Sequence, residues 1–73
     1  MATIEVKADI TGNVWKVLKR AGDAVGADEP IVILESMKME IPITSPEPGV
    51  IREILVKEDE TVGEGAVVVR IEV

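Results

Sequence analysis

The chain repeats itself at an offset of 37 residues, and this internal repeat limits the fold more than any other feature of the sequence. Residues 12–35 align with residues 49–72 without a gap. Identical residues coincide at several positions, among them Gly12 and Gly49, Val25 and Val62, Gly26 and Gly63, Val32 and Val69, and Glu35 and Glu72. Two copies are too few for a stacked repeat array. We therefore expect one closed domain, residues 1–73, with internal two-fold pseudosymmetry.

Both copies carry the pattern of short β-strands. Apolar and polar residues alternate over 13–19 and 50–56, which predicts a strand after Gly12 and another after Gly49. Acidic turns follow at 21–23 and 58–60, and β-branched strands close the copies at 31–34 and 67–71. We expect Gly26 and Gly63 to permit tight bends between these elements.

Helices are not expected anywhere in the chain. Pro30, Pro42, Pro46 and Pro48 interrupt every long helical window. Several short strands separated by turns are typical of a small sandwich or barrel. The sequence therefore predicts an all-β fold.

Composition excludes several classes of function. The net charge of −6 disfavours nucleic acid and anionic membrane surfaces as partners. The chain has no histidine and no cysteine, so ordinary zinc sites and Cys-His nucleophiles are excluded, and we expect no catalytic residue and no metal. Apolar runs are too short to span a membrane, and residues 1–7 alternate and carry charge, unlike a signal peptide. We expect a cytoplasmic protein.

One lysine stands in an unusual position between the two copies. Strands 31–36 and 40–44 are expected to form a hairpin with Met37, Lys38 and Met39 at its turn. Tight hairpin turns usually use Asn-Gly or Asp-Gly, so turn propensity does not explain this sequence. A lone turn lysine is ordinarily only solvated. Flanking methionines, however, suit recognition by the apolar surface of a partner. We interpret Lys38 as a residue presented to a partner, placed on the axis that relates the two halves.

The segment Glu35-Ser36-Met37-Lys38-Met39 resembles the biotin attachment motif of biotin carboxyl carrier proteins, within the biotinyl/lipoyl attachment domain family. The surrounding repeat, and Pro46 and Gly49 after the motif, extend the resemblance to essentially the whole chain. It implies a flattened barrel, or barrel-sandwich hybrid, of two four-stranded antiparallel sheets. It also implies that Lys38 is the covalent biotin attachment site on a hairpin tip.

The resemblance implies a carrier rather than an enzyme. A biotin protein ligase would biotinylate Lys38, with Met37 and Met39 recognised by the ligase. The chain would then carry carboxybiotin, as a swinging arm, between the biotin carboxylase and carboxyltransferase components of a carboxylase such as an acyl-CoA carboxylase. Glu35 recurs as Glu72, which indicates a structural role; recognition by the ligase is a secondary hypothesis for it. We expect a monomer when the protein is isolated.

Two alternatives remain open at this point. Lipoyl domains of 2-oxoacid dehydrogenase or glycine-cleavage systems resemble this family in fold, but usually place Asp before the lysine and a small residue after it, so Met37 and Met39 favour biotin over lipoate. The other alternative is an unmodified structural module. The chain lacks an Ala/Pro-rich linker and a "thumb" insertion near residues 19–23, and so looks like a minimal, free-standing attachment protein.

Overall fold

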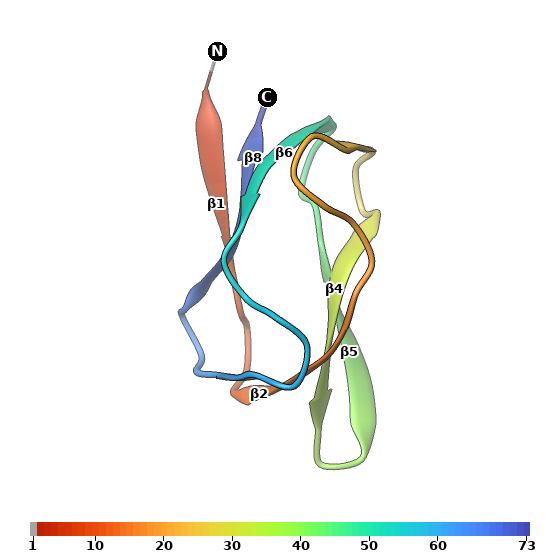
Figure 1. Ribbon diagram of the computed structural model, residues 1–73, viewed down its shortest axis with the longest axis vertical. Coiled ribbons are helices and arrows are strands. Elements are labelled where there is room, and N and C mark those ends of the chain that lie inside the picture. Colours follow the sequence, from red (N-terminus) through yellow and green to blue (C-terminus); the bar gives the residue numbers. More distant parts are fainter. Residues whose placement is uncertain (1) are drawn as a thin grey trace.

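Eight β-strands form two four-stranded antiparallel sheets in the computed structural model, which describes residues 2–73 (Figure 1). The strands are β1 (Thr3–Lys7), β2 (Gly12–Val17), β3 (Ala24–Val25), β4 (Pro30–Ser36), β5 (Met39–Thr44), β6 (Gly49–Ile54), β7 (Thr61–Val62) and β8 (Val67–Glu72). One sheet has the order β1-β8-β6-β3 and the other β5-β4-β2-β7. The expected all-β architecture of two four-stranded sheets is confirmed. No helix in the described part of the chain could cross a membrane.

The 37-residue offset maps one sheet onto the other, strand by strand. We call residues n and n + 37 repeat mates. β2, β3 and β4 are the mates of β6, β7 and β8, and β1 is the mate of β5. Even the irregularities recur, because the register shifts between Val14 and Lys16 in β2 and between Ile51 and Glu53 in β6. The repeat is therefore longer than the predicted halves 12–35 and 49–72, and it includes the edge strands.

The core lies between the two sheets and consists of aliphatic side chains. Alternation along each strand sends every second side chain inward. The buried mates include Val14 with Ile51, Val32 with Val69, and Leu34 with Ile71. The full set of buried apolar residues is Ala8, Val14, Val25, Ile31, Val32, Leu34, Ile43, Ile51, Val62, Val68, Val69 and Ile71. Each half thus contributes an equivalent share of one core.

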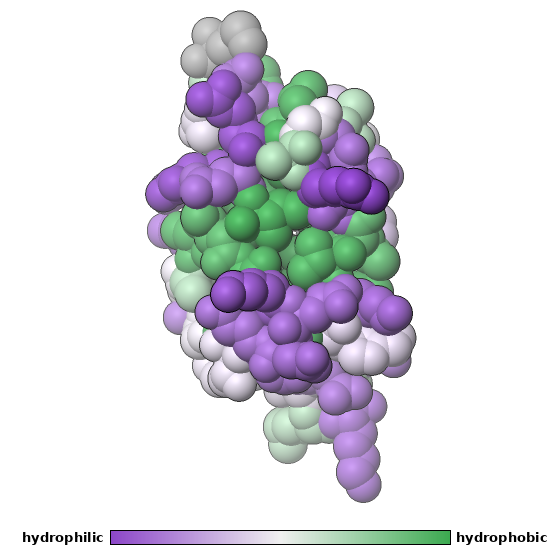
Figure 2. Space-filling view, in the orientation of Figure 1, coloured by the Kyte–Doolittle hydropathy of each residue, from purple (hydrophilic) through white to green (hydrophobic). Residues whose placement is uncertain are grey.

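Two connecting segments close the sandwich by crossing between the sheets, one from β2 to β3 and the other from β6 to β7 (Figure 1). Each is held by a backbone hydrogen bond that its mate repeats: Val14 N donates to Glu60 O at 2.7 Å, and Ile51 N donates to Asp23 O at 2.8 Å. Figure 2 shows an apolar band across the middle of this face. Each segment carries one leucine: Leu18, which is exposed, and Leu55, which is half-buried.

The glycines of the two copies lie at turns or where two strands approach closely. Turns do follow Gly26 and Gly63, but the left-handed backbone lies two residues later, at Asp28 and Gly65 (φ 64° and 87°). The tight bends expected at Gly26 and Gly63 are present, since Glu29 N donates to Gly26 O at 3.2 Å and Ala66 N donates to Gly63 O at 3.0 Å. Gly49, by contrast, is required by close approach, since a Cβ there would lie 2.5 Å from Glu72 O. Its mate Gly12 is less crowded, with a Cβ 2.9 Å from Glu35 O.

Candidate functional site

The β4–β5 hairpin places Lys38 in a two-residue turn. Ser36 pairs with Met39 in the last step of the ladder, which leaves Met37 and Lys38 as the loop. Both have positive φ, 51° and 67°, as a type I′ turn demands. The left-handed region costs a residue with a Cβ roughly 1–2 kcal/mol. Backbone preference therefore opposes this pair of residues, and their side chains must supply the reason for their presence.

All three side chains at the tip are open to solvent. Met37 is 92% exposed and Met39 is 62% exposed, and Lys38 is exposed between them. Burying a methionine typically stabilises a protein by about 1.5–3 kcal/mol, and neither of these side chains receives that benefit. The tip is thus an amine framed by two accessible thioether side chains.

The β4–β5 hairpin, whose turn holds Lys38, reaches one end of the molecule, and β1 begins and β8 ends toward the other (Figure 1). The molecule measures 36 Å along its longest axis and 18 Å and 17 Å along the others. Val73 is the mate of Ser36, and Ala2 is the mate of Met39. These two mates also pair with each other, since Val73 N donates to Ala2 O at 2.9 Å. The expectation that Lys38 lies on the pseudosymmetry axis was wrong. Lys38 is central in the sequence, but it lies at one end of the folded molecule, and the pseudosymmetry relates that end to the opposite one.

Two carboxylates lie directly below the tip. Glu35 and Glu40 face each other across the hairpin, and both are exposed. Like charges in this position repel each other. Neither forms an ion pair within residues 2–73. Glu72, the mate of Glu35, does form one, with Arg52 at 3.2 Å, but the mate of Arg52 is Trp15. Glu35 and Glu72 are the same residue type at matching positions, but Glu35 does not form the ion pair that Glu72 forms. The recurrence therefore does not indicate a shared structural role for the two side chains.

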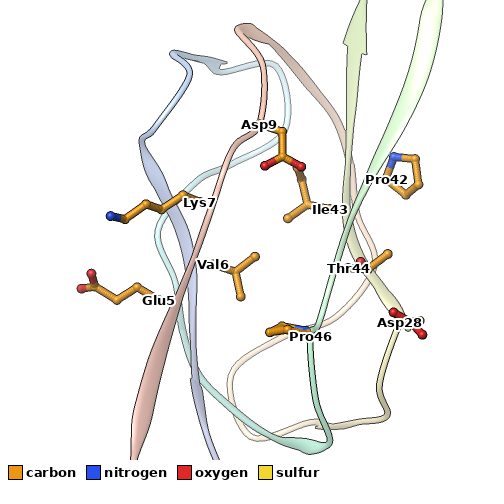
Figure 3. Close-up of a pocket in the computed structure, with 9 residues that line it drawn as sticks. All are labelled: Glu5, Val6, Lys7, Asp9, Asp28, Pro42, Ile43, Thr44 and Pro46. Carbon is orange, nitrogen blue, oxygen red and sulfur yellow. The ribbon is translucent and has the colours of Figure 1, made fainter.

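A shallow groove between edge strands β1 and β5 lies away from the tip (Figure 3). Val6 and its mate Ile43 lie on facing sides of this groove, while the side chains of Glu5 and Lys7 point away from it. None of Lys38, Met37, Met39 or Glu35 lines it. Residues 2–73 also hold no group of three metal-ligating side chains. Neither feature offers an alternative to the hairpin tip as the candidate site.

Comparison with known proteins assigns the chain to a family of carrier domains. The family model described as "Biotin-requiring enzyme", for the biotin/lipoyl domain, matches residues 3–71. The chain therefore belongs to the biotin/lipoyl attachment domain family. It is similar to the biotin/lipoyl attachment protein of Bacillus subtilis, with 42% identity over 66 residues that cover 90% of each chain. Domains of this family are carriers, so the chain is a carrier domain and not a catalyst.

Two further comparisons show the range of this family. The chain is 45% identical over 60 residues to the dihydrolipoyllysine-residue acetyltransferase component of pyruvate dehydrogenase from Corynebacterium glutamicum, matching 82% of this chain and 9% of that protein. Its structure resembles part of the urea carboxylase of Kluyveromyces lactis, with a TM-score of 0.93, 29% identity, and coverage of 99% of this chain and 6% of that one. Relatives thus include both carboxylases and dihydrolipoyl acyltransferases.

Proposed function

We propose that this chain is a biotin carrier whose attachment residue is Lys38. The observation that carries the proposal is the geometry of the tip: an exposed lysine in a strained two-residue turn, between two exposed methionines. The amine suits a cofactor that is held through its carboxyl group by an amide bond. Lys38 forms no ion pair within residues 2–73, so no partner of its own chain competes for the amine.

The chain depends on a separate ligase for its modification. A lysine amine is almost entirely protonated at neutral pH, and only the neutral form is a nucleophile. Within residues 2–73 no group is placed to take the proton, since the tip is open to water and the carboxylates next to it in the hairpin lie on the strands below. The ligase must therefore deliver the acid with a good leaving group and accept the proton from Lys38 Nζ. Exposure of the whole turn lets it enter an active site.

Once attached, biotin would supply the carboxyl-transfer chemistry, and the protein would supply its presentation. The hairpin holds the attachment point at the far end of the molecule from the chain ends, so the tip can enter other active sites without the body following (Figure 1). Tethering raises the effective concentration of the cofactor near each partner to the millimolar range, about the value for short flexible links. We propose biotin carboxylase and carboxyltransferase components as those partners, in the cytoplasm.

A lipoyl carrier is the second candidate function. The similarity to a dihydrolipoyl acetyltransferase favours it. The methionines on both sides of Lys38 favour biotin instead, by the motif that the chain resembles. Both functions use the same lysine, so the position of the attachment does not distinguish them.

Coexpression with each ligase separates the two functions. The chain is produced with a biotin protein ligase or with a lipoate protein ligase, each with its acid supplied, and the intact mass is measured. We expect a biotin-sized increment in the first case and little or no increment in the second. A lipoyl-sized increment without a biotin-sized one would establish the second candidate and refute the first.

A further inference from the structure

The outward faces of the two sheets differ, although the two sheets are repeat mates. On the β1-β8-β6-β3 sheet, a row of three residues crosses the strands: Glu5, Arg70 and Glu53. Arg70 bonds both neighbours, with Nε 3.2 Å from Glu5 Oε2 and Nη1 2.7 Å from Glu53 Oε1. The charges of this row are paired within the chain.

The mates of these three residues form no row of ion pairs on the other sheet, because two of the three are uncharged. Pro42, Ile33 and Lys16 occupy the same row of the β5-β4-β2-β7 sheet. Pro42 is exposed and Ile33 is half-buried. A proline and an isoleucine therefore replace a glutamate and an arginine at matching positions of matching sheets. The β1-β8-β6-β3 sheet has the same strand arrangement and holds charged residues at the matching positions. Folding alone therefore does not require apolar residues on the β5-β4-β2-β7 sheet.

Trp15 extends this apolar row. It is the extra residue of the β2 bulge, where the register skips from Val14 to Lys16, and 41% of its surface is exposed. Lys16 Nζ lies 5.7 Å from the centre of its ring. The mate of Trp15 is Arg52, which forms an ion pair with Glu72. At the bulge, as in the row, a charged residue on one sheet corresponds to an apolar one on the other.

The same face continues to the attachment hairpin. Its strands β4 and β5 lead directly into the turn at Lys38, and Glu35 and Glu40 lie on them between the apolar row and the tip. The row at Ile33 is three residue pairs below the last pair of the hairpin, or about 10 Å at the rise of a β-strand. A protein that takes Lys38 into its active site can therefore also contact this face.

We propose that the outer face of the β5-β4-β2-β7 sheet, centred on Trp15, Ile33 and Pro42, docks the ligase that modifies Lys38. The complementary surface is apolar where it meets this row, and it presents lysine or arginine opposite Glu35 and Glu40. Those two carboxylates repel each other in the free protein and lack a cation within residues 2–73, so a basic partner relieves both conditions. This proposal rests on the proposed function.

Exchanging mates provides a matched pair of variants. Trp15→Arg gives this face the residue of the other sheet and places a cation beside Glu35. Arg52→Trp makes the reverse change on the β1-β8-β6-β3 sheet. Steady-state biotinylation is measured with a bacterial biotin protein ligase, biotin and ATP, with thermal unfolding of each variant to confirm its fold. We expect Trp15→Arg to raise KM about thirtyfold, the effect of losing an interface anchor, with kcat little changed. Arg52→Trp stays within about twofold of the wild type.

A second variant tests the contribution of Glu35 and Glu40 to docking and leaves Trp15 unchanged. Replacing both carboxylates, Glu35→Gln with Glu40→Gln, should raise KM at low salt and reduce its dependence on ionic strength. Equal KM values for the wild type, Trp15→Arg and the double glutamine variant would overturn the docking proposal and leave the proposed function intact. An unmodified wild type would refute the proposed function itself, so the two failures are distinguishable.

Discussion

The two ends of this molecule are repeat mates, and only one of them is closed. At one end β4 and β5 are joined by Met37 and Lys38. At the other end β8 and β1 meet as the chain termini, where Val73 N donates to Ala2 O without any covalent turn. The paired strands form at both ends, so the core does not depend on the residues that make the turn. Met37 and Lys38 were therefore free to be chosen for what they present.

The comparison extends to the body of the molecule. Mates that face the core are alike, such as Val32 and Val69, since both pack in the same interior. Mates on the outer faces differ, such as Ile33 and Arg70. Packing constrains the inside of both halves equally but not their outer faces, and our proposal is that a partner selects the outside of one half. Differences between mates at the surface are thus a guide to function in this chain.

The largest effect is expected where the two halves are most crowded. Gly49→Ala would place a Cβ 2.5 Å from Glu72 O and 2.7 Å from Ile71 Cγ2, so β6 and β8 must separate. We expect a loss of about 3 kcal/mol in the free energy of unfolding, measured in urea. Gly12→Ala, its mate, meets one backbone oxygen at 2.9 Å and should cost clearly less. Equal losses for the two variants would show that the halves are more alike than the structure indicates.

In the β4–β5 turn, a substitution should stabilise the protein and at the same time weaken its function. Met37 has a φ of 51°, a conformation that glycine adopts without a steric penalty. Met37→Gly is expected to raise the free energy of unfolding by about 1 kcal/mol. It should also slow biotinylation, because it removes a side chain that the ligase contacts. A variant that is less stable than the wild type would argue against strain at this turn.

Substituting the methionines conservatively should affect only ligation. Met37→Leu and Met39→Leu keep exposed apolar side chains, so the free energy of unfolding should change by less than about 0.5 kcal/mol. We expect each to slow biotinylation severalfold, because leucine is branched and lacks the flexible thioether. Ligation at the wild-type rate would mean that any exposed apolar side chain serves at these positions.

A smaller effect is expected at the β3–β4 turn, where Lys19 Nζ lies 2.6 Å from Glu29 Oε2. The hydrogen bond from Lys19, and a second from Gly26 N, lower the pKa of the Glu29 carboxyl, and the bond to Glu29 raises the pKa of Lys19. The carboxylate therefore contributes stability above the ordinary pKa of a glutamate, and this contribution is lost as the pH falls through the lowered value. The lysine contribution is lost at alkaline pH, as the pH rises through its raised value.

Replacing Glu29 by the residue of its mate tests this pair. Glu29→Ala copies Ala66 and removes the carboxylate. The melting temperature should fall slightly at neutral pH, and the difference from the wild type should vanish in strong acid. A difference that persists undiminished in acid would show that Glu29 stabilises the turn by some means other than its charge.

Much of this architecture could be predicted from the sequence because the repeat records it twice. Strands at 13–19 and 50–56 were expected from alternation and are present in shortened form. The equivalence of β1 and β5 was missed, since its only signals are weak matches such as Ile4 with Ile41 and Val6 with Ile43.

The docking face could not be predicted, because it depends on register. Ile33 pairs with Pro42 in the regular register of the hairpin, but Lys16 joins this row only because the bulge in β2 shifts the pairing of β2 with β4. The position of Lys38 at an end of the molecule likewise required the sheet order, which the linear repeat does not contain. The exposure of Lys38, in contrast, was predictable, because the sequence places it in a hairpin turn that lacks the residues such turns usually have.

The most direct test of the account is to find which lysine carries biotin. The chain has five lysines, Lys7, Lys16, Lys19, Lys38 and Lys57, and only Lys38 is in the strained turn. The protein is coexpressed with a biotin protein ligase, and peptide mass spectrometry locates the modification in the wild type and in Lys38→Arg. We expect biotin on Lys38 alone, and an unmodified but fully folded Lys38→Arg. Biotin on another lysine, or none on the wild type, would contradict the account.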